Sequence, residues 1–302
     1  MNKKFFIDKK THDVLFCILI LLIPMVQFAV FYIGVNFNSF VMAFQRYEEN
    51  AETNLGRYVF NGFENFGKMF TQIKNEGVFL LALKNSFLSF ALITLVGIVF
   101  ALVFSMYIFK KLPGAGVFRV LLFAPSILSA VVTVTMYKYF VEGAVPAMFG
   151  LKEGLLANSS TKLGTIIFFN IWIGFGTQIL MYSGAMNGID PSISEAAKLD
   201  GANPFVEFFK IILPLIFPTI QTFVVTGVAS IFVNQINLVA FEGLNTQGRY
   251  MTVGYYLFKN TEAATQYEYP LLATYGISLT LIAAPLTLLV RFLMDKFGPS
   301  VE

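Results

Sequence analysis

The sequence has few charged residues and few of the side chains that usually build reactive or metal-binding sites. Of 302 residues, 13% are charged and 56% hydrophobic, whereas a soluble domain carries about a quarter charged residues. One cysteine, Cys17, excludes a disulfide within the chain, and one histidine, His12, excludes most metal and acid–base sites. The net charge of +3, without a basic cluster among aromatic residues, argues against nucleic-acid binding. The composition predicts a membrane protein that crosses the bilayer several times.

Six long stretches contain no Lys, Arg, Asp or Glu. Crossing the hydrocarbon takes roughly 20 helical residues, so we predict an all-α, polytopic protein with six transmembrane helices. The fifth stretch is longer than a span needs, and we expect part of it to leave the bilayer, tilt or break. The stretches are residues 14–35, 85–109, 120–137, 163–189, 211–241 and 269–290.

The first stretch follows four lysines, but it is longer than the apolar core of a usual signal peptide and lacks a small-residue cleavage site. We therefore expect a permanent first helix, with the N-terminus and, after six helices, the C-terminus in the cytoplasm. This orientation places Lys110, Lys111 and Arg119 in a short inner loop, which agrees with the positive-inside rule.

A polar, charged segment at residues 190–210 separates the fourth and fifth apolar stretches. Ser192 and Glu195 form an S-x-x-E capping box that would start a helix at Ser192. Asp190 and Pro191 offer the alternative of a cap followed by proline in the first turn. Both alternatives predict a short helix outside the membrane.

The same segment contains signals for a turn and a second helix. Gly201 suits a left-handed residue at a helix end, and Asn203-Pro204 provides a new cap and first turn. Ala196 and Ala197 keep one side of the first helix thin, so that another protein can approach closely. The pattern predicts a rigid helix–turn–helix elbow that binds a soluble partner.

The spacing within this elbow resembles the EAA signature of the membrane-spanning subunits of bacterial ATP-binding-cassette importers, in their sugar-permease branch. Glu195-Ala196-Ala197 is followed after three residues by Gly201, and nine residues later by Ile211-x-Leu213-Pro214. An ordinary amphipathic loop helix would explain the charges but not these specified positions. The resemblance implies the type I importer permease fold and an elbow that docks on a separate ATPase. Its coupling residues would be Glu195, Ala196, Ala197, Asp200 and Gly201.

The resemblance runs from about residue 61 to residue 290. Residues 118–125 are similar to the opening of the third helix in sugar permeases, and residues 61–66 match in part the stretch before the second. Asn237 stands where the family commonly has aspartate, so the resemblance is weaker at the residues that form the outer gate of the family's pathway. We expect residues 1–80 to form the tail, first helix and outer loop, and residues 81–298 the five-helix importer core.

Polar residues at helical spacing indicate a path for solute. The fifth stretch carries six of them at steps of three and four, on one face if the helix is continuous. At membrane depth such groups need partners from protein or water, so this face is expected to point inward. Hydroxyls that bond to carbonyls of their own helix are the alternative, and for the threonines both readings stay open. The larger amides of Asn234 and Asn237 favour a wet cavity. The six residues are Thr219, Thr222, Thr226, Ser230, Asn234 and Asn237.

Other helices add hydroxyl, amide and aromatic side chains to this path. Thr133 and Tyr137 lie in the third stretch, where they form a shorter predicted stripe with Ser126 and Ser129 at steps of three and four. Trp172 and Gln178 lie in the fourth stretch. With no charge in any stretch, these groups favour a neutral carbohydrate, which needs directional hydrogen bonds and flat apolar surfaces. Packing between helices is the alternative reading for Trp172 and Tyr182.

The chain has no GxxxxGK[ST] loop, so it is not expected to hydrolyse ATP itself. The resemblance implies a second homologous permease, two ATPase subunits that bind ATP and Mg, and an extracellular solute-binding protein, with no cofactor in this chain. It places the protein in the bacterial cell membrane, in contact with lipid. A gradient-driven carrier of a neutral solute is the alternative, although proton coupling usually relies on intramembrane carboxylates or histidines, which the stretches lack. A membrane scaffold would explain the helices but not the elbow.

Overall fold

The computed structural model describes residues 9–49 and 56–299. Lys3 and Lys4, on which the predicted orientation partly rests, lie outside these residues, as does the C-terminal end. The chain forms two compact units: one contains the chain up to Gln72 together with Ala263–Ser278, and the other contains Ile73–Glu262 and the chain from Leu279 onward. The two units are described separately.

The first unit is built on one long apolar helix. Helix α1 (Lys9–Gln27) continues through a π-helical stretch (Phe28–Gly34) into α2 (Val35–Met42). The apolar window of this helix is exposed along its whole length, as expected of a helix surrounded by lipid.

A two-stranded antiparallel hairpin follows, formed by β1 (Gln45–Glu49) and β2 (Gly56–Phe60). Behind it, the buried amide of Asn65, near the start of α3 (Glu64–Glu76), donates to the carbonyls of Ala43 and Gln45. Thr274, in the first half of α16 (Tyr269–Phe297), donates to the carbonyl of Ala43 as well. The segment that leads into β1, residues 43–45, therefore accepts hydrogen bonds from two helices.

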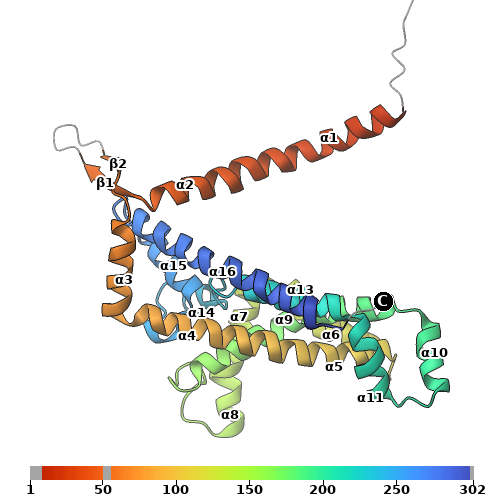
Figure 1. Ribbon diagram of the computed structural model, residues 1–302. Helices are drawn as coiled ribbons and strands as arrows, with labels where there is room; N and C mark the ends of the chain where they lie inside the picture. Colours follow the sequence, from red (N-terminus) through yellow and green to blue (C-terminus); the bar gives the residue numbers. More distant parts are fainter. Residues whose placement is uncertain (1–8, 50–55, 300–302) are drawn as a thin grey trace, which may run out of the picture. The chain divides into compact units, whose positions relative to one another are not determined.

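The second unit holds most of the helices (Figure 1). Its first long helix runs from α4 (Val78–Ala91) through a π-helical stretch (Leu92–Val96) into α5 (Gly97–Phe109). Figure 1 shows α10 and α11 projecting at one end of this unit. The remaining elements are α6 (Ala115–Ile127), α7 (Ala130–Tyr139), a π-helical stretch (Phe140–Ala144), α8 (Val145–Phe149), α9 (Lys162–Asn187), α10 (Pro191–Leu199), α11 (Pro204–Glu207), a π-helical stretch (Phe208–Ile212), α12 (Leu213–Leu215), α13 (Phe217–Ala229), α14 (Leu238–Glu242), a 3-10 turn (Gly248–Tyr250), α15 (Val253–Glu262) and the second half of α16.

The structure contains four to six candidate membrane spans, and the upper number equals the predicted six. Over the described residues, four helices are long and apolar enough to cross a membrane, and two further spans appear if each of two bent helix pairs counts as one. The four are Asp13–Met42, Val78–Phe109, Lys162–Asn187 and Tyr269–Phe297; the bent pairs are Ala115–Ile127 with Ala130–Phe149, and Pro204–Leu215 with Phe217–Ala229.

The third predicted helix, residues 120–137, is not continuous. α6 and α7 meet at a bend of 107°. Leu128 has extended backbone, and Ser129 starts α7 anew by accepting a hydrogen bond from the N–H of Val132. Ser126 and Thr133 therefore lie on different helices, and the predicted single stripe through them is wrong. Ser129 caps the new helix α7, so its spacing from Ser126 does not indicate a shared helical face.

The fifth predicted helix, residues 211–241, is broken as well. It bends by 65° between α12 and α13, and α13 ends at Ala229. Thr219, Thr222 and Thr226 lie on α13, whereas Ser230, Asn234 and Asn237 lie in the segment that leads to α14. The expectation of one continuous six-residue face is therefore wrong beyond Ala229, and the predicted break is confirmed.

The core of the second unit packs α5 against α9 and the start of α13. Its buried members include Ile108 of α5, Ile179 of α9 and Ile220 of α13. The hydroxyl of Ser105 donates to the carbonyl of Ile179, which joins α5 to α9. α9 also packs closely against α6: a Cβ on Gly176 would meet the carbonyl oxygen of Leu122 at 2.6 Å, so glycine permits this approach.

Candidate functional site

The elbow begins at Asp190, which decides between the two caps. Its side-chain Oδ1 accepts a hydrogen bond of 2.9 Å from the N–H of Ser192, and Pro191 occupies the first turn. The hydrogen bond from the Ser192 backbone N–H, and next that from the Ser192 hydroxyl, lowers the pKa of the Asp190 carboxyl. The alternative based on Asp190 and Pro191 is therefore confirmed.

The turn of the elbow follows the predicted pattern. Gly201 has φ of +76°, a left-handed conformation that favours glycine. The N–H of Ala202 donates to the carbonyl of Ala197 and closes the turn. Asn203 then caps α11 by accepting from the N–H of Val206 at 2.9 Å, with Pro204 in its first turn. The sequence signals for the turn and for the second helix thus agree with the backbone.

The predicted coupling residues divide between two sides of the elbow. Glu195, Ala196, Asp200 and Gly201 are exposed, whereas Ala197 is buried against the rest of the chain. The most exposed apolar side chains here were not singled out from the sequence. Leu199 is 90% exposed and Phe205 76% exposed, so the elbow presents apolar and acidic groups together.

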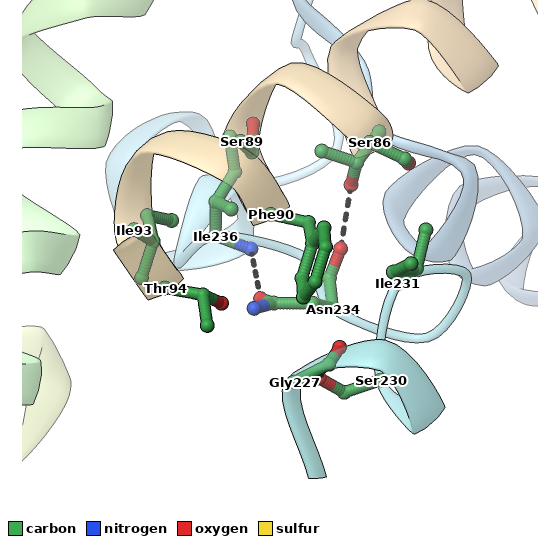
Figure 2. A pocket seen from close by; sticks show the side chains of 11 residues that line it. Ser86, Ser89, Phe90, Ile93, Thr94, Gly227, Ser230, Ile231, Asn234 and Ile236 are labelled. Atoms are coloured by element: carbon green, nitrogen blue, oxygen red, sulfur yellow. Dashed lines mark hydrogen bonds between the residues drawn. The ribbon is translucent and has the colours of Figure 1, made fainter. Parts of the chain in front are cut away.

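The fifth span is also interrupted between α13 and α14, at residues 230–237, and this segment, called the break below, contains strained backbone. Ile236 and Asn237 have φ of 45° and 58°, in the left-handed region, which a β-branched residue rarely adopts. The side-chain oxygen of Asn234 accepts from the N–H of Ile236 at 2.8 Å (Figure 2). The hydroxyl of Thr252 donates to the Asn234 carbonyl. Strain held in place by surrounding bonds is typical of functional sites.

Asn170 of α9 holds the other side of this break. Its side-chain nitrogen donates to the carbonyls of Ile166 and Ile236, at 2.8 and 2.9 Å. Its oxygen accepts from the side-chain nitrogen of Asn237 at 2.8 Å. We did not predict Asn170 from the sequence, although an amide in the middle of an apolar span is itself a signal for function.

Two hollows adjoin the break, and Asn234 borders both. The smaller has a volume of about 20 Å³, enough for one water molecule. Figure 2 shows Ser89, Thr94 and Ser230 around it; within the described residues, the Ser89 hydroxyl has no hydrogen-bond partner. The larger hollow has a volume of about 500 Å³, and its lining contains three amides and no charged side chain. That lining is Val131, Val233, Asn234, Gln235, Ile236, Asn237, Val239 and Ala240.

The hydroxyls on the predicted path bond mainly within their own helices. Thr222 donates to the carbonyl of Pro218, Ser230 to that of Gly227, and Thr133 to that of Ser129. Thr226 is exposed. Among these residues only Ser230 reaches a hollow, the smaller one, so the hydroxyls fit the local alternative and the amides fit the cavity.

The aromatic candidates belong to a packed cluster beside the break. The ring of Tyr137 lies 6.2 Å from that of Trp172 and also contacts Phe169 and Phe241, and its hydroxyl donates to the carbonyl of Thr165. Gln178 lies against Gly97 and lines neither hollow. The structure thus brings Asn234, Asn237 and Ser230 together and leaves Gln178 apart.

These features describe an almost entirely helical protein with apolar spans, two of them broken, with uncharged amides at one break and a capped elbow outside the core. A family model described as "Binding-protein-dependent transport system inner membrane component" matches residues 93–302. The chain belongs to this family of multi-pass inner-membrane proteins.

Curated relatives include two maltose/maltodextrin transport system permease proteins, MalF. That of Klebsiella aerogenes is 27% identical over 236 residues, covering 73% of this chain and 44% of the relative. That of Escherichia coli K12 is 27% identical over 71% of this chain and 43% of the relative. The chain thus spans under half the length of these relatives. A probable ABC transporter permease of Mycoplasma pneumoniae is 32% identical over 53% of this chain and 50% of its own length.

Solved structures share the fold. A chain of a bacterial ABC transporter involved in the import of the acidic polysaccharide alginate has a TM-score of 0.75 at 20% identity, covering 96% of this chain and 98% of its own. A chain from the alginate transporter in complex with an alginate pentasaccharide-bound periplasmic protein has a TM-score of 0.76 at 19% identity.

Proposed function

We propose that this chain is the permease subunit of an ATP-driven, solute-binding-protein-dependent carbohydrate importer, and that it forms half of the translocation pathway. The observation that carries the proposal is the broken fifth span, where Asn234 and Asn237 face a hollow of about 500 Å³. Pockets for small molecules usually measure about 300–1,000 Å³. Membership of a binding-protein-dependent transport family supports the same reading.

A neutral oligosaccharide fits the lining of this hollow best. Amides can donate and accept hydrogen bonds with sugar hydroxyls, and Val131, Val239 and Ala240 supply apolar surface. An acidic sugar would need positive groups, and the lining has none. The alginate transporter therefore informs the fold of this chain, while the lining suggests a different, uncharged substrate.

The elbow is proposed to bind a separate ATPase subunit, which holds the ATP and Mg. Leu199 and Phe205 are the exposed apolar groups of the elbow, and Glu195 and Asp200 add negative charge nearby. Exposed apolar groups on an otherwise polar surface are typical of a protein-binding site. This arrangement puts both chain ends in the cytoplasm and requires two ATPases, a second permease and an extracellular binding protein.

The alternative is a gradient-driven carrier of a neutral solute. The six predicted stretches carry no carboxylate or histidine for proton coupling, and such a carrier has no use for the elbow. Affinity purification of the tagged chain from its own cells separates the two: an importer subunit brings an ATPase and a second permease, whereas a carrier is isolated without them.

Transport by the purified complex in lipid vesicles provides the direct test. We expect uptake of labelled neutral oligosaccharides that requires ATP and the binding protein. Uptake driven by a proton or sodium gradient without ATP would contradict the proposed energy source. A preference for acidic over neutral oligosaccharides would contradict the proposed substrate class.

A further inference from the structure

The strongest unassigned feature is a buried carboxylate between the elbow and the helical core. The Glu207 side chain, at the end of α11, is 3% exposed. Its Oε1 lies 2.5 Å from the ammonium of Lys110, and it accepts a hydrogen bond of 2.9 Å from the hydroxyl of Ser194. One carboxylate thus joins both elbow helices to the residue that directly follows α5.

This contact matters because the elbow has no continuous helical connection to its neighbours. On one side, Gly188–Asp190 separate α9 from α10. On the other, the chain passes through the π-helical stretch Phe208–Ile212 and α12, and then bends by 65° before α13. Both covalent links can change direction at these points, and the ion pair adds a direct polar contact with the end of α5 to the packing of Ile212 and Ile216 in the core.

The Lys110 end of the contact leads into the most densely packed part of the unit. α5 packs along α9 through Ile108, Ile179 and Met186, and Ser105 bonds to the α9 carbonyl at Ile179. α9 in turn carries Asn170, which bonds to the strained segment at Ile236. Packed helices and hydrogen bonds therefore connect the elbow to the larger hollow through discrete contacts.

We propose that Lys110 and Glu207 are positioning residues that transmit elbow movement to α5, and hence to the break in the fifth span. This inference rests on the proposed ATPase-binding role of the elbow. Among the described residues, the side-chain hydrogen bonds and ion pair of Lys110 and Glu207 involve neither of the exposed docking residues Leu199 and Phe205. Removal of the Lys110 ammonium leaves the buried Glu207 carboxylate with the Ser194 hydroxyl alone, and removal of the carboxylate leaves the partly exposed Lys110 without this ion pair. Either change loosens the attachment. Loss of the pair is therefore expected to uncouple the elbow while leaving its docking surface intact.

The test compares Glu207→Gln, Lys110→Met and the charge exchange Lys110→Glu/Glu207→Lys in the complete importer in vesicles. For each single variant, ATP hydrolysis stimulated by the loaded binding protein is expected to fall about tenfold, within the usual range of coupling between sites. The ATPase subunits remain bound in a pull-down assay, and the charge exchange recovers at least about half of the lost stimulation. Glu64→Gln is the matched control, because it removes an exposed ion pair with Lys68 and is expected to change nothing.

Three results would overturn this inference. One is unchanged stimulation in both single variants, and another is loss of the ATPase subunits from them, since the pair would then serve docking. The third is failure of all three variants to assemble, which would make the pair a folding element only. Gly201→Asp is measured in parallel. If Gly201→Asp leaves stimulation intact, the proposed role of the elbow is wrong. If Gly201→Asp lowers stimulation but the ion-pair variants do not, only the role of the ion pair is refuted.

Discussion

The side-chain amide of Asn237 donates a hydrogen bond of 2.8 Å to the side-chain oxygen of Asn170, 67 residues earlier in the chain. Asn170 also bonds to the carbonyl of Ile236, so one amide holds two consecutive residues with left-handed backbone. The span is therefore broken at a defined place. Ile236 and Asn237 also line the larger of the two hollows, with a volume of about 500 Å³.

Asn170→Leu is expected to lower the free energy of unfolding by about 1–2 kcal/mol, because the carbonyl of Ile236 and the amide of Asn237 lose a buried partner. Thermal unfolding of the purified protein in detergent measures this change. Asn260→Leu is the control, since among the described residues that amide is seen to bond to a carbonyl of its own helix, at Tyr256. Equal stability of the two variants would show that Asn170 does not hold the break.

Asn234→Asp is expected to raise the KM for neutral sugar uptake severalfold without unfolding the break. The carboxylate still accepts from the N–H of Ile236, but it offers no N–H to the solute. Asn234→Leu removes both functions and is expected to lower uptake further while the ATPase stays bound. Thr222→Val serves as control, because that hydroxyl bonds to its own helix. Wild-type uptake by Asn234→Leu would place the pathway elsewhere.

Gly201→Asp and Glu195→Lys are expected to abolish solute-stimulated ATP hydrolysis while membrane insertion stays intact. At Gly201 any side chain is strained by the φ of +76°, at a cost of about 1 kcal/mol or more, although a Cβ meets no atom within 4 Å. Gly201→Ala isolates this backbone effect from charge. Gly116→Ala is its control, since that glycine lies in α6 without a positive φ and also has free space. Stimulated turnover equal to wild type in Gly201→Asp would refute coupling through the elbow.

Ala196→Cys in a Cys17→Ser background is expected to react with a membrane-impermeant thiol reagent only when the cytoplasmic side is accessible. The chain has no other cysteine, and Ala196 is exposed on the elbow. Labelling of intact cells compared with inside-out vesicles measures the side. Reaction in intact cells would place the elbow outside, where no ATPase can bind it.

Local sequence signals predicted much of the elbow and the apolar stretches that form the candidate spans. Gly201 and Asn203-Pro204 each specify backbone geometry within a few residues, and the structure has that geometry. The choice between Asp190 and Ser192 as cap stayed open because both offer an oxygen at a suitable spacing. Likewise, the lack of charge in the long stretches predicts that they cross the bilayer, but it carries no information about where a helix bends.

The apolar, nearly chargeless sequence by itself determined that this is a helical membrane protein with an elbow outside the bilayer, since hydrophobicity and helix caps act over neighbouring residues. Only the tertiary structure decided that the fifth span breaks at Ser230–Asn237, that Asn170 holds the break, and that Glu207 meets Lys110. The physical reason is that each of these contacts satisfies a buried polar group with a partner far away in the chain. No periodicity or local spacing records such a pairing.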